Sequence, residues 1–307
     1  MAALSGVLIA LQARANGELS YLLGNSLEAA LVSFGSGLII IAVIALFHPG
    51  IKLGIAKLLK ALGQGSLPRW RIFAGTLGGS FVAMQTHVVP LVGVAMYSVA
   101  AIAGQTAMSL VVDRIGLTGG GVKHISPRRI AAAFVTVLAV LVSVLDRFDV
   151  QRFAFWAVVL AVFAGALVGI QRALNGQINE FTEQSATTSL LNFIMGTSFL
   201  ALLMVVMMMM KGTRLVALPN GPWWIYTGGV IGVVYIAFTS TIVQHLGVLT
   251  FTLFSVGGNL LGGLLIDIYS PTEGVHISWY LVSGIVMTYI GVVINGTKGH
   301  QRLPARN

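Results

Sequence analysis

Long apolar runs separated by short polar breaks fill the chain from residue 2 to residue 296. A helix needs about 20 mostly apolar residues to cross the hydrocarbon core of a bilayer. Ten runs approach or exceed that length, roughly 2–23, 27–47, 71–91, 94–113, 128–146, 153–178, 186–210, 223–243, 246–268 and 277–296. The pattern therefore predicts an all-α membrane protein with ten transmembrane helices.

The segment 48–70 departs from this pattern, because it carries Lys52, Lys57 and Lys60 among apolar residues at helical spacing. A short helix with one apolar and one basic face is typical of a segment that lies on the membrane surface. We therefore expect an amphipathic surface helix here, in addition to the ten spans.

Composition agrees with a lipid environment. Hydrophobic residues make up 56% of the 307 residues and charged residues only 9%, whereas a soluble domain is about 25% charged. The net charge of +9 sits in short loops between apolar runs, which the positive-inside rule explains better than a nucleic-acid-binding face. The chain has no cysteine, so disulfides, thiol catalysis and thiolate metal sites are excluded.

The distribution of basic residues predicts the orientation. With the N-terminus inside, twelve basic residues fall in inner loops and the C-terminal tail: Lys52, Lys57, Lys60, Arg69, Arg71, Arg114, Lys123, Arg128, Arg129, Lys298, Arg302 and Arg306. Only Arg147, Arg152, Lys211 and Arg214 fall in outer loops. Because inner loops are enriched in Lys and Arg, both termini are expected in the cytoplasm.

An internal repeat starts in the first apolar run. Nine residues recur 159 positions later without a gap: Gly6, Leu8, Gln12, Asn16, Gly17, Ser26, Leu31, Phe34 and Gly37 match Gly165, Leu167, Gln171, Asn175, Gly176, Ser185, Leu190, Phe193 and Gly196. Amides within apolar helices are costly, so a matched set of them indicates duplication rather than chance.

The repeat continues at an offset of 154, because the loop at 48–70 is longer than the loop at 211–222. Gly75, Gly78, Ala83, Gly93, Gly104, Leu110 and Asp113 match Gly229, Gly232, Ala237, Gly247, Gly258, Leu264 and Asp267. Each repeat then holds five helices, in residues 1–150 and 151–307. Since five is odd, the second repeat enters the membrane from the opposite side, as in the inverted repeats of secondary transporters.

Two motifs resemble a known family. Gly-x5-Gln-x3-Asn opens each half, and Gly93-x10-Gly104-Gln105 leads to Asp113-Arg114-Ile115-Gly116-Leu117. Together with the two five-helix halves, these motifs resemble the YdcZ-like bacterial branch of the drug/metabolite transporter superfamily. The second half departs from the pattern, with Asn259 in place of Gln105 and Ile268-Tyr269-Ser270 after Asp267. The resemblance implies a protein of the bacterial inner membrane that moves small molecules.

The matched amides are the first candidates for a solute site. Gln12 and Asn16 are four residues apart and share one helix face, as do Gln171 and Asn175. Neutral amides offer donors and acceptors without the cost of burying a charge. They are expected either to line a cavity for a polar solute or to hold helices together through interhelical hydrogen bonds.

Three further polar residues lie in apolar runs. Gln105 and Asn259 hold matching positions next to glycines, which favour close helix approach, so they are candidates for the bundle interior. His87 follows Gln85 and precedes Pro90. It is expected either to pack through a hydrogen bond or to couple protons, because histidine changes charge near physiological pH.

Charged residues provide the remaining candidates. Arg14 and Glu18 are four residues apart, a spacing that favours an ion pair. The two charges are expected either to neutralise each other near a water-filled vestibule or to take part in substrate or proton coupling. The second half has no equivalent pair, which argues against a function that needs both halves. Asp113 and Asp267 hold matching helix ends and are expected to act as caps, salt bridges or gates, Asp113 with Arg114 or Arg128.

Enzyme signatures are missing: there is no Gly-x4-Gly-Lys loop, His-Glu-x2-His or Gly-x-Ser-x-Gly. No cofactor, metal or nucleic acid is expected as a partner. The sequence predicts a secondary transporter that binds a small molecule within the lipid bilayer, with the first, third, fourth, sixth, eighth and ninth helices around its cavity. A structural or assembly subunit and a lipid-modifying enzyme are the alternatives, and a homodimer is left open.

Overall fold

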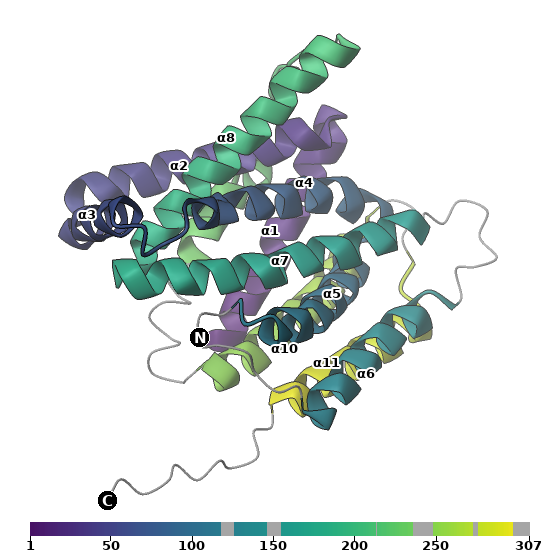
Figure 1. The fold of residues 1–307 in the computed structure, drawn as a ribbon. Helices are drawn as coiled ribbons and strands as arrows, with labels where there is room; N and C mark the ends of the chain where they lie inside the picture. Colours follow the sequence, from purple (N-terminus) through teal and green to yellow (C-terminus); the bar gives the residue numbers. More distant parts are fainter. Residues whose placement is uncertain (118–125, 146–154, 213, 236–247, 273–275, 297–307) are drawn as a thin grey trace, which may run out of the picture.

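The fold was obtained as a computed structural model that describes residues 1–117, 126–145, 155–212, 214–235, 248–272 and 276–296 (Figure 1). Within these ranges the regular secondary structure is helical. The α-helices are α1 (Ala2–Leu23), α2 (Ser26–Phe47), α3 (Pro49–Gly63), α4 (Ala74–Val92), α5 (Val94–Arg114), α6 (Pro127–Ser143), α7 (Phe155–Thr182), α8 (Ser185–Lys211), α10 (Val248–Tyr269) and α11 (Trp279–Gly296). Two 3₁₀ turns, η1 (Arg69–Phe73) and η3 (Trp223–Tyr226), precede α4 and a helix at 228–235.

Helices occupy the described part of each predicted run. Among the described residues, five stretches are long and apolar enough to cross a membrane: Ser26–Phe47, Arg69–Val92, Val94–Arg114, Phe155–Thr182 and Ser185–Lys211. Residues 254–269 and 279–294 form shorter apolar helices. The predicted run at 223–243 is a 3₁₀ turn followed by a helix, and its part beyond residue 235 lies outside the described residues.

The helix ends follow from local sequence. Gly24 adopts a left-handed conformation with φ of 62° and ends α1, a conformation that glycine adopts without strain. The side chain of Asn25 then accepts a hydrogen bond from the backbone N–H of Glu28 and caps α2. One residue, Gly93 with φ of 85°, separates α4 from α5, so the chain turns there without a loop.

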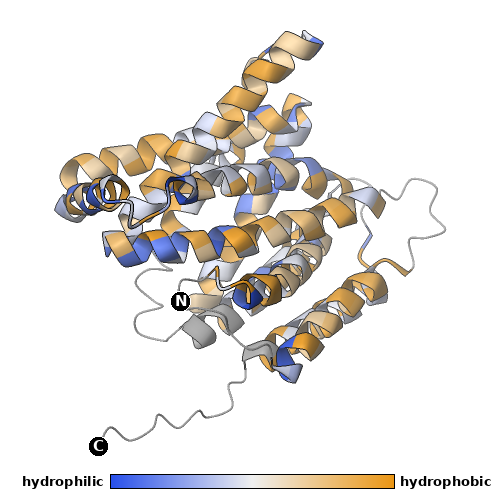
Figure 2. Ribbon diagram, in the orientation of Figure 1, coloured by the Kyte–Doolittle hydropathy of each residue, from blue (hydrophilic) through white to orange (hydrophobic). Residues whose placement is uncertain are grey.

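The helix α3 is the predicted amphipathic helix of segment 48–70. It buries Ile51, Gly54, Leu58 and Ala61 and exposes most of its other face. Lys57 on α3 pairs with Glu183 just after α7 at 2.5 Å. Figure 2 shows polar residues gathered on α3 and at the nearby end of α7, while apolar residues cover most of the other helices.

The core is built around α5. Every residue from 92 to 104 is buried, and most of these side chains are small. This helix packs against α7, α6 and α10. The helices α6 and α11 lie side by side along one margin of the molecule, whereas α4 and α7 run next to each other across its middle (Figure 1).

Glycines bring several helix pairs into backbone contact. A Cβ on Gly6 of α1 would overlap the carbonyl oxygen of Ser255 on α10, and a Cβ on Gly165 of α7 would overlap the carbonyl oxygen of Ala101 on α5. Gly165 lies 159 residues after Gly6, and Ser255 lies 154 residues after Ala101. The α1–α10 and α7–α5 contacts therefore use matched positions of the repeat.

Other glycines show the same correspondence. Gly104 lies against the carbonyl of Val162, and Gly258 lies against the carbonyl of Ala3. These positions again match at offsets of 154 and 159. The matched positions therefore make matching contacts between helices, although the loops of the two halves differ in length.

Candidate functional site

Asn16 of α1 and Gln85 of α4 form a buried amide pair. Both side chains are completely buried, and Asn16 Nδ2 donates to Gln85 Oε1 at 3.2 Å. Asn16 Oδ1 and Gln85 Nε2 have no partner among the described residues. The pair therefore keeps one free acceptor and one free donor away from bulk solvent, an arrangement that normally calls for a bridging water or ligand.

Gln12, one turn earlier on α1, reaches the helix at 228–235. Its Nε2 donates to the carbonyl of Gly228 at 2.8 Å. A Cβ on Gly232 would come 2.9 Å from the same nitrogen, and a Cβ on Gly228 would overlap Asn16 Oδ1. The two glycines make room for the two amides of α1.

The matched amides of α7 form a network with α8. Gln171 Nε2 donates to Asn192 Oδ1 at 3.0 Å, and Asn192 Nδ2 donates to Asn175 Oδ1 at 2.9 Å. Asn192 Nδ2 also donates to the carbonyl of Thr188 at 2.8 Å. All three amides are half-buried. Gly78 of α4 lies against the Gln171 amide, just as Gly232 lies against Gln12.

The two amide sets lie on different helix contacts. The α1 set meets α4 and the 228–235 helix, and the α7 set meets α8 and α4. No hydrogen bond among the described residues joins one set to the other. The structure also adds α8, which is the seventh predicted run (186–210), to the helices expected around the site. It does so because Asn192 of α8 completes the second network.

Gln105 and Asn259 lie on α5 and α10 and are half-buried. Asn259 Oδ1 accepts a hydrogen bond from Ser98 Oγ at 3.4 Å, which is a long contact. The backbone of Asn259 lies against Gly6. These residues sit at closely packed helix contacts and apart from the two amide sets.

His87 is exposed and points away from the buried amides of its own helix. Its ring centroid lies 5.3 Å from that of Trp156, and its Nδ1 lies 3.3 Å from Ser26 Oγ. The histidine therefore joins α4 to the starts of α7 and α2, while its neighbour Gln85 faces inward.

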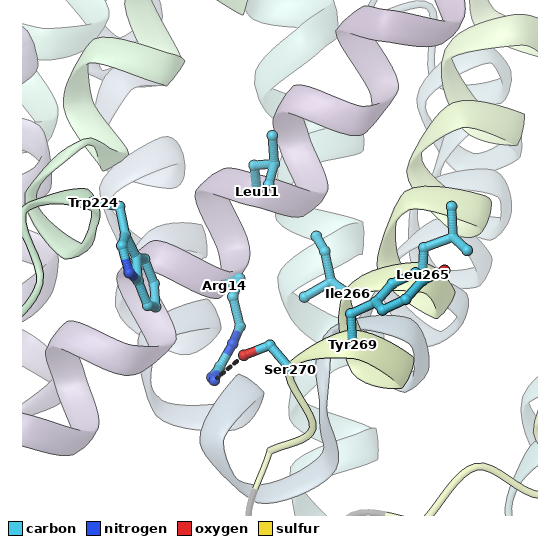
Figure 3. A pocket seen from close by; sticks show the side chains of 7 residues that line it. All are labelled: Leu11, Arg14, Trp224, Leu265, Ile266, Tyr269 and Ser270. Atoms are coloured by element: carbon cyan, nitrogen blue, oxygen red, sulfur yellow. Dashed lines mark hydrogen bonds between the residues drawn. The ribbon is translucent and has the colours of Figure 1, made fainter.

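Arg14 and Glu18 form the predicted ion pair, with Nη1 and Oε2 2.8 Å apart. Arg14 Nη2 also donates to Ser270 Oγ at 3.1 Å, and the guanidinium carbon lies 5.9 Å from the Trp224 ring centre. Arg14, Trp224 and Ser270 border a groove of about 500 Å³ between α1, η3 and α10. Figure 3 shows Arg14 reaching from α1 towards the end of α10, with Trp224 on its other side.

Asp267 is a helix cap, one of the roles expected for it. Its carboxylate is 2% exposed and accepts hydrogen bonds from the backbone N–H groups of Val94 at 3.1 Å and Ala95 at 2.8 Å. It thereby binds the end of α10 to the start of α5. Asp113 pairs with Arg129 of α6. The expected partners were Arg114 and Arg128, but Arg129 is the residue of α6 that reaches α5.

Gln85, Asn192 and Glu28 were not identified as candidates from the sequence. The repeat selects positions that carry an amide in both halves, but Asn192 matches Ser33 and Gln85 matches Thr239. Glu28 is 4% exposed, and its carboxylate accepts hydrogen bonds from the Val216 N–H at 3.1 and 3.3 Å. The signal available in the sequence was a carboxylate near the start of an apolar run.

A family model described as "Putative inner membrane exporter, YdcZ" matches residues 1–142 and 156–294. The chain belongs to the YdcZ family. Membership of this family and the apolar helices identify a transport protein of the membrane, within the drug/metabolite transporter superfamily. The match falls in two stretches and leaves residues 143–155 between them unmatched.

The chain also resembles a solved structure described only as "Crystal structure of protein". The two share 16% sequence identity and a TM-score of 0.50, over 95% of this chain and 93% of the other. At this identity the likeness concerns the fold alone. No curated protein matches the chain.

Proposed function

We propose that this YdcZ-family chain is a secondary transporter of ten transmembrane helices in two inverted five-helix halves, residues 1–150 and 151–307. It moves a small polar or amphipathic solute across the bacterial inner membrane by alternating access, with both termini in the cytoplasm. The observation that carries the proposal is the matched amide–glycine contact: Gln12 against Gly232, and Gln171 against Gly78.

Reciprocal contacts support the duplication. If two halves are related by a two-fold axis, every contact between residue a of the first half and residue b of the second recurs with the roles exchanged. The contacts of Gly6, Gly104, Gly165 and Gly258 follow this rule. An axis in the membrane plane is the arrangement that an odd number of helices per half requires.

The amides support a solute site because they are neutral, buried and incompletely paired. The acceptor of Asn16 and the donor of Gln85 have no partner among the described residues. A solute hydroxyl or amide presents both complementary groups at once. In the second network Asn192 uses both its oxygen and its nitrogen in hydrogen bonds, so the first network is the stronger candidate for solute contact.

The family description names an exporter, and we adopt export as the direction. A pump driven by ATP is not proposed, because the chain has no phosphate-binding Gly-x4-Gly-Lys loop. The energy of export would then come from an ion gradient or from the solute gradient itself.

A ligand-dependent thermal-shift screen of the purified protein tests the proposal. A solute that raises the melting temperature of the wild type is then measured for flux in liposomes. Asn16→Ala is expected to abolish both the shift and the flux while the apo melting temperature changes little. Asn179→Ala removes an exposed amide of α7, a helix that carries neither Asn16 nor Gln85, and serves as the control. If no stabilising ligand shows flux in liposomes, the transport proposal is wrong, and a structural or lipid-modifying role is favoured instead.

A further inference from the structure

The groove beside Arg14 is a second candidate binding site, separate from the buried amides. Its volume of about 500 Å³ lies within the range of about 300–1,000 Å³ that small-molecule pockets occupy. Its lining combines apolar and aromatic side chains with one cation and one hydroxyl: Leu11, Arg14, Trp224, Leu265, Ile266, Tyr269 and Ser270 (Figure 3). A ligand with an apolar body and a polar head matches this lining.

Arg14 has unused hydrogen-bonding capacity at the groove. A guanidinium carries five N–H donors in a planar fork. In this structure Nη1 binds Glu18, Nη2 binds Ser270, and the buried Nε has no partner among the described residues. Each contact uses one N–H of its amino group, so Nη1 and Nη2 each keep one further N–H that a carboxylate could accept from, one oxygen to each nitrogen.

The repeat shows that packing does not require this charge. The positions of α7 that match Arg14 and Glu18 are Ala173 and Gln177, whereas Trp224 is matched by Trp70. Nevertheless α7 packs on α5 through the same glycine–carbonyl contact that joins α1 to α10. Gln177 instead donates to the carbonyl of Leu117. Both halves therefore make the same glycine–carbonyl contact between helices, but only the first half carries the ion pair.

We propose that this groove binds a single-chain amphiphile with a carboxylate head. The head engages the Arg14 fork, and the chain lies along Leu11, Leu265 and Ile266, two of which are substantially exposed at 42% for Leu11 and 51% for Leu265. Charge complementarity selects the head, because Arg14 is the cation among the lining residues. The inference concerns binding and does not depend on transport.

Glu18 competes with the ligand for Arg14. It is the ion-pair partner of Arg14 within the described part of the chain, and its side chain is 24% exposed. A ligand carboxylate therefore gains more when Glu18 is neutral. Replacing Glu18 by glutamine removes the competing charge and keeps the shape, so the Glu18→Gln variant should bind the amphiphile more tightly than the wild type.

Trp224 provides the measurement, because bromine atoms quench the fluorescence of a nearby indole. The probe is dodecanoate brominated close to its carboxylate, because the Arg14 guanidinium carbon lies 5.9 Å from the Trp224 ring centre. It is added to the purified protein in a neutral detergent. We expect saturable quenching that disappears in Trp224→Phe. Trp70→Phe, which changes the matched tryptophan of the other half, should leave the saturable signal unchanged.

Head-group variants separate recognition from partitioning. Arg14→Gln is expected to weaken the apparent affinity at least about tenfold, the loss expected for a charge-assisted hydrogen bond. Arg14→Lys keeps the charge without the fork and should bind weakly as well, which provides a second reading if Arg14→Gln fails to fold. The methyl ester of the same brominated acid should show no saturable quenching.

Three outcomes would overturn the proposal. Equal quenching by the acid and its methyl ester would mean that only apolar partitioning occurs. Unchanged affinity in both Arg14 variants would remove the guanidinium from the site. Loss of quenching in nanodiscs with phosphatidylglycerol, but not in phosphatidylcholine alone, would identify the occupant as a two-chain bilayer lipid.

Discussion

The rings of Phe34 on α2 and Phe193 on α8 lie 5.4 Å apart between centroids, at an interplanar angle of 53°. Each ring also fills the space beside a glycine of the opposite helix, Phe34 at Gly196 and Phe193 at Gly37. Each glycine follows the phenylalanine of its own helix by three residues. The contact between α2 and α8 is thus made twice, once in each direction.

Glycines at backbone contacts should tolerate no side chain. Gly6→Ala and Gly165→Ala each place a methyl group on a carbonyl oxygen of the neighbouring helix, so we expect each to destabilise the protein by about 1–3 kcal/mol. The two variants should lower the melting temperature in detergent by similar amounts, because their contacts are equivalent.

Gly176→Ala is the matched control for these variants. Gly176 is also helical, but no atom lies within 4 Å of a Cβ at that position. Alanine there should be neutral or stabilising by about 0.5–1 kcal/mol, because glycine loses more conformational freedom in a helix. A Gly6→Ala melting temperature equal to that of Gly176→Ala would contradict the α1–α10 contact.

The cap formed by Asp267 should be one of the most sensitive carboxylates in the chain. Asp267→Ala leaves the buried N–H groups of Val94 and Ala95 without these acceptors, at about 1–3 kcal/mol for each. Asp267→Asn should be milder, since one acceptor oxygen remains. Thermal unfolding of both variants checks the order.

A surface carboxylate provides the comparison for Asp267. Glu183 is 70% exposed and pairs with Lys57, and such pairs contribute about 0–1 kcal/mol. Glu183→Ala should therefore change the melting temperature little. If Asp267→Ala were equally harmless, the start of α5 would not depend on this cap.

Asn192 should couple energetically to Asn175. Asn192→Ala removes the acceptor of Gln171 and the donor to Asn175, and interhelical hydrogen bonds in membranes contribute about 0.6 kcal/mol on average and up to about 1.7. A double-mutant cycle with Asn175→Ala isolates the pair. A coupling energy of zero would show that the Asn192–Asn175 bond does not stabilise the fold.

The absence of cysteine permits a direct test of the inverted arrangement. Ile115 and Tyr269 are matched positions at the ends of α5 and α10, and both are exposed. We expect Tyr269→Cys to react with an impermeant maleimide in intact cells, and Ile115→Cys to react only after permeabilisation. Labelling of both variants from the same side would exclude the inverted topology.

The helix ranges followed from the sequence because apolar run length is a strong constraint in a membrane. The ion pair of Arg14 with Glu18 also followed, since spacing of four residues fixes the geometry within one helix. The amphipathic helix α3 was identified from its apolar periodicity.

Partners across helices could not be obtained in the same way. Asn16 was a candidate, but its partner Gln85 lies 69 residues away and has no amide at its matched position. His87 is two residues from Gln85 and faces outward, which a uniformly apolar helix does not reveal. Duplication identifies what both halves share, whereas the groove and the Asn192 network depend on residues that only one half carries.

Some helices of the molecule touch through their backbones, whereas others touch through side chains. Backbone-close contacts and the Asp267 clamp join α1, α10, α5 and α7 into one continuous body. Backbone contacts likewise join α4 to α8 through Gly75 and Asn192, and α2 to the 228–235 helix through Gly229 and Ser33. Such contacts leave little freedom for sliding.

Between these three bodies (α1, α10, α5 and α7; α4 and α8; α2 with the 228–235 helix) the polar and aromatic contacts are made by side chains. Gln12 and Asn16 bridge α1 to the 228–235 helix and to α4, Gln171 bridges α7 to α8, and Phe34 meets Phe193 between α2 and α8. Relative movement is therefore least costly where an amide can exchange one hydrogen-bond partner for another. We propose that the duplicated amides exchange partners in this way during transport, so that they hold these bodies together in each conformation.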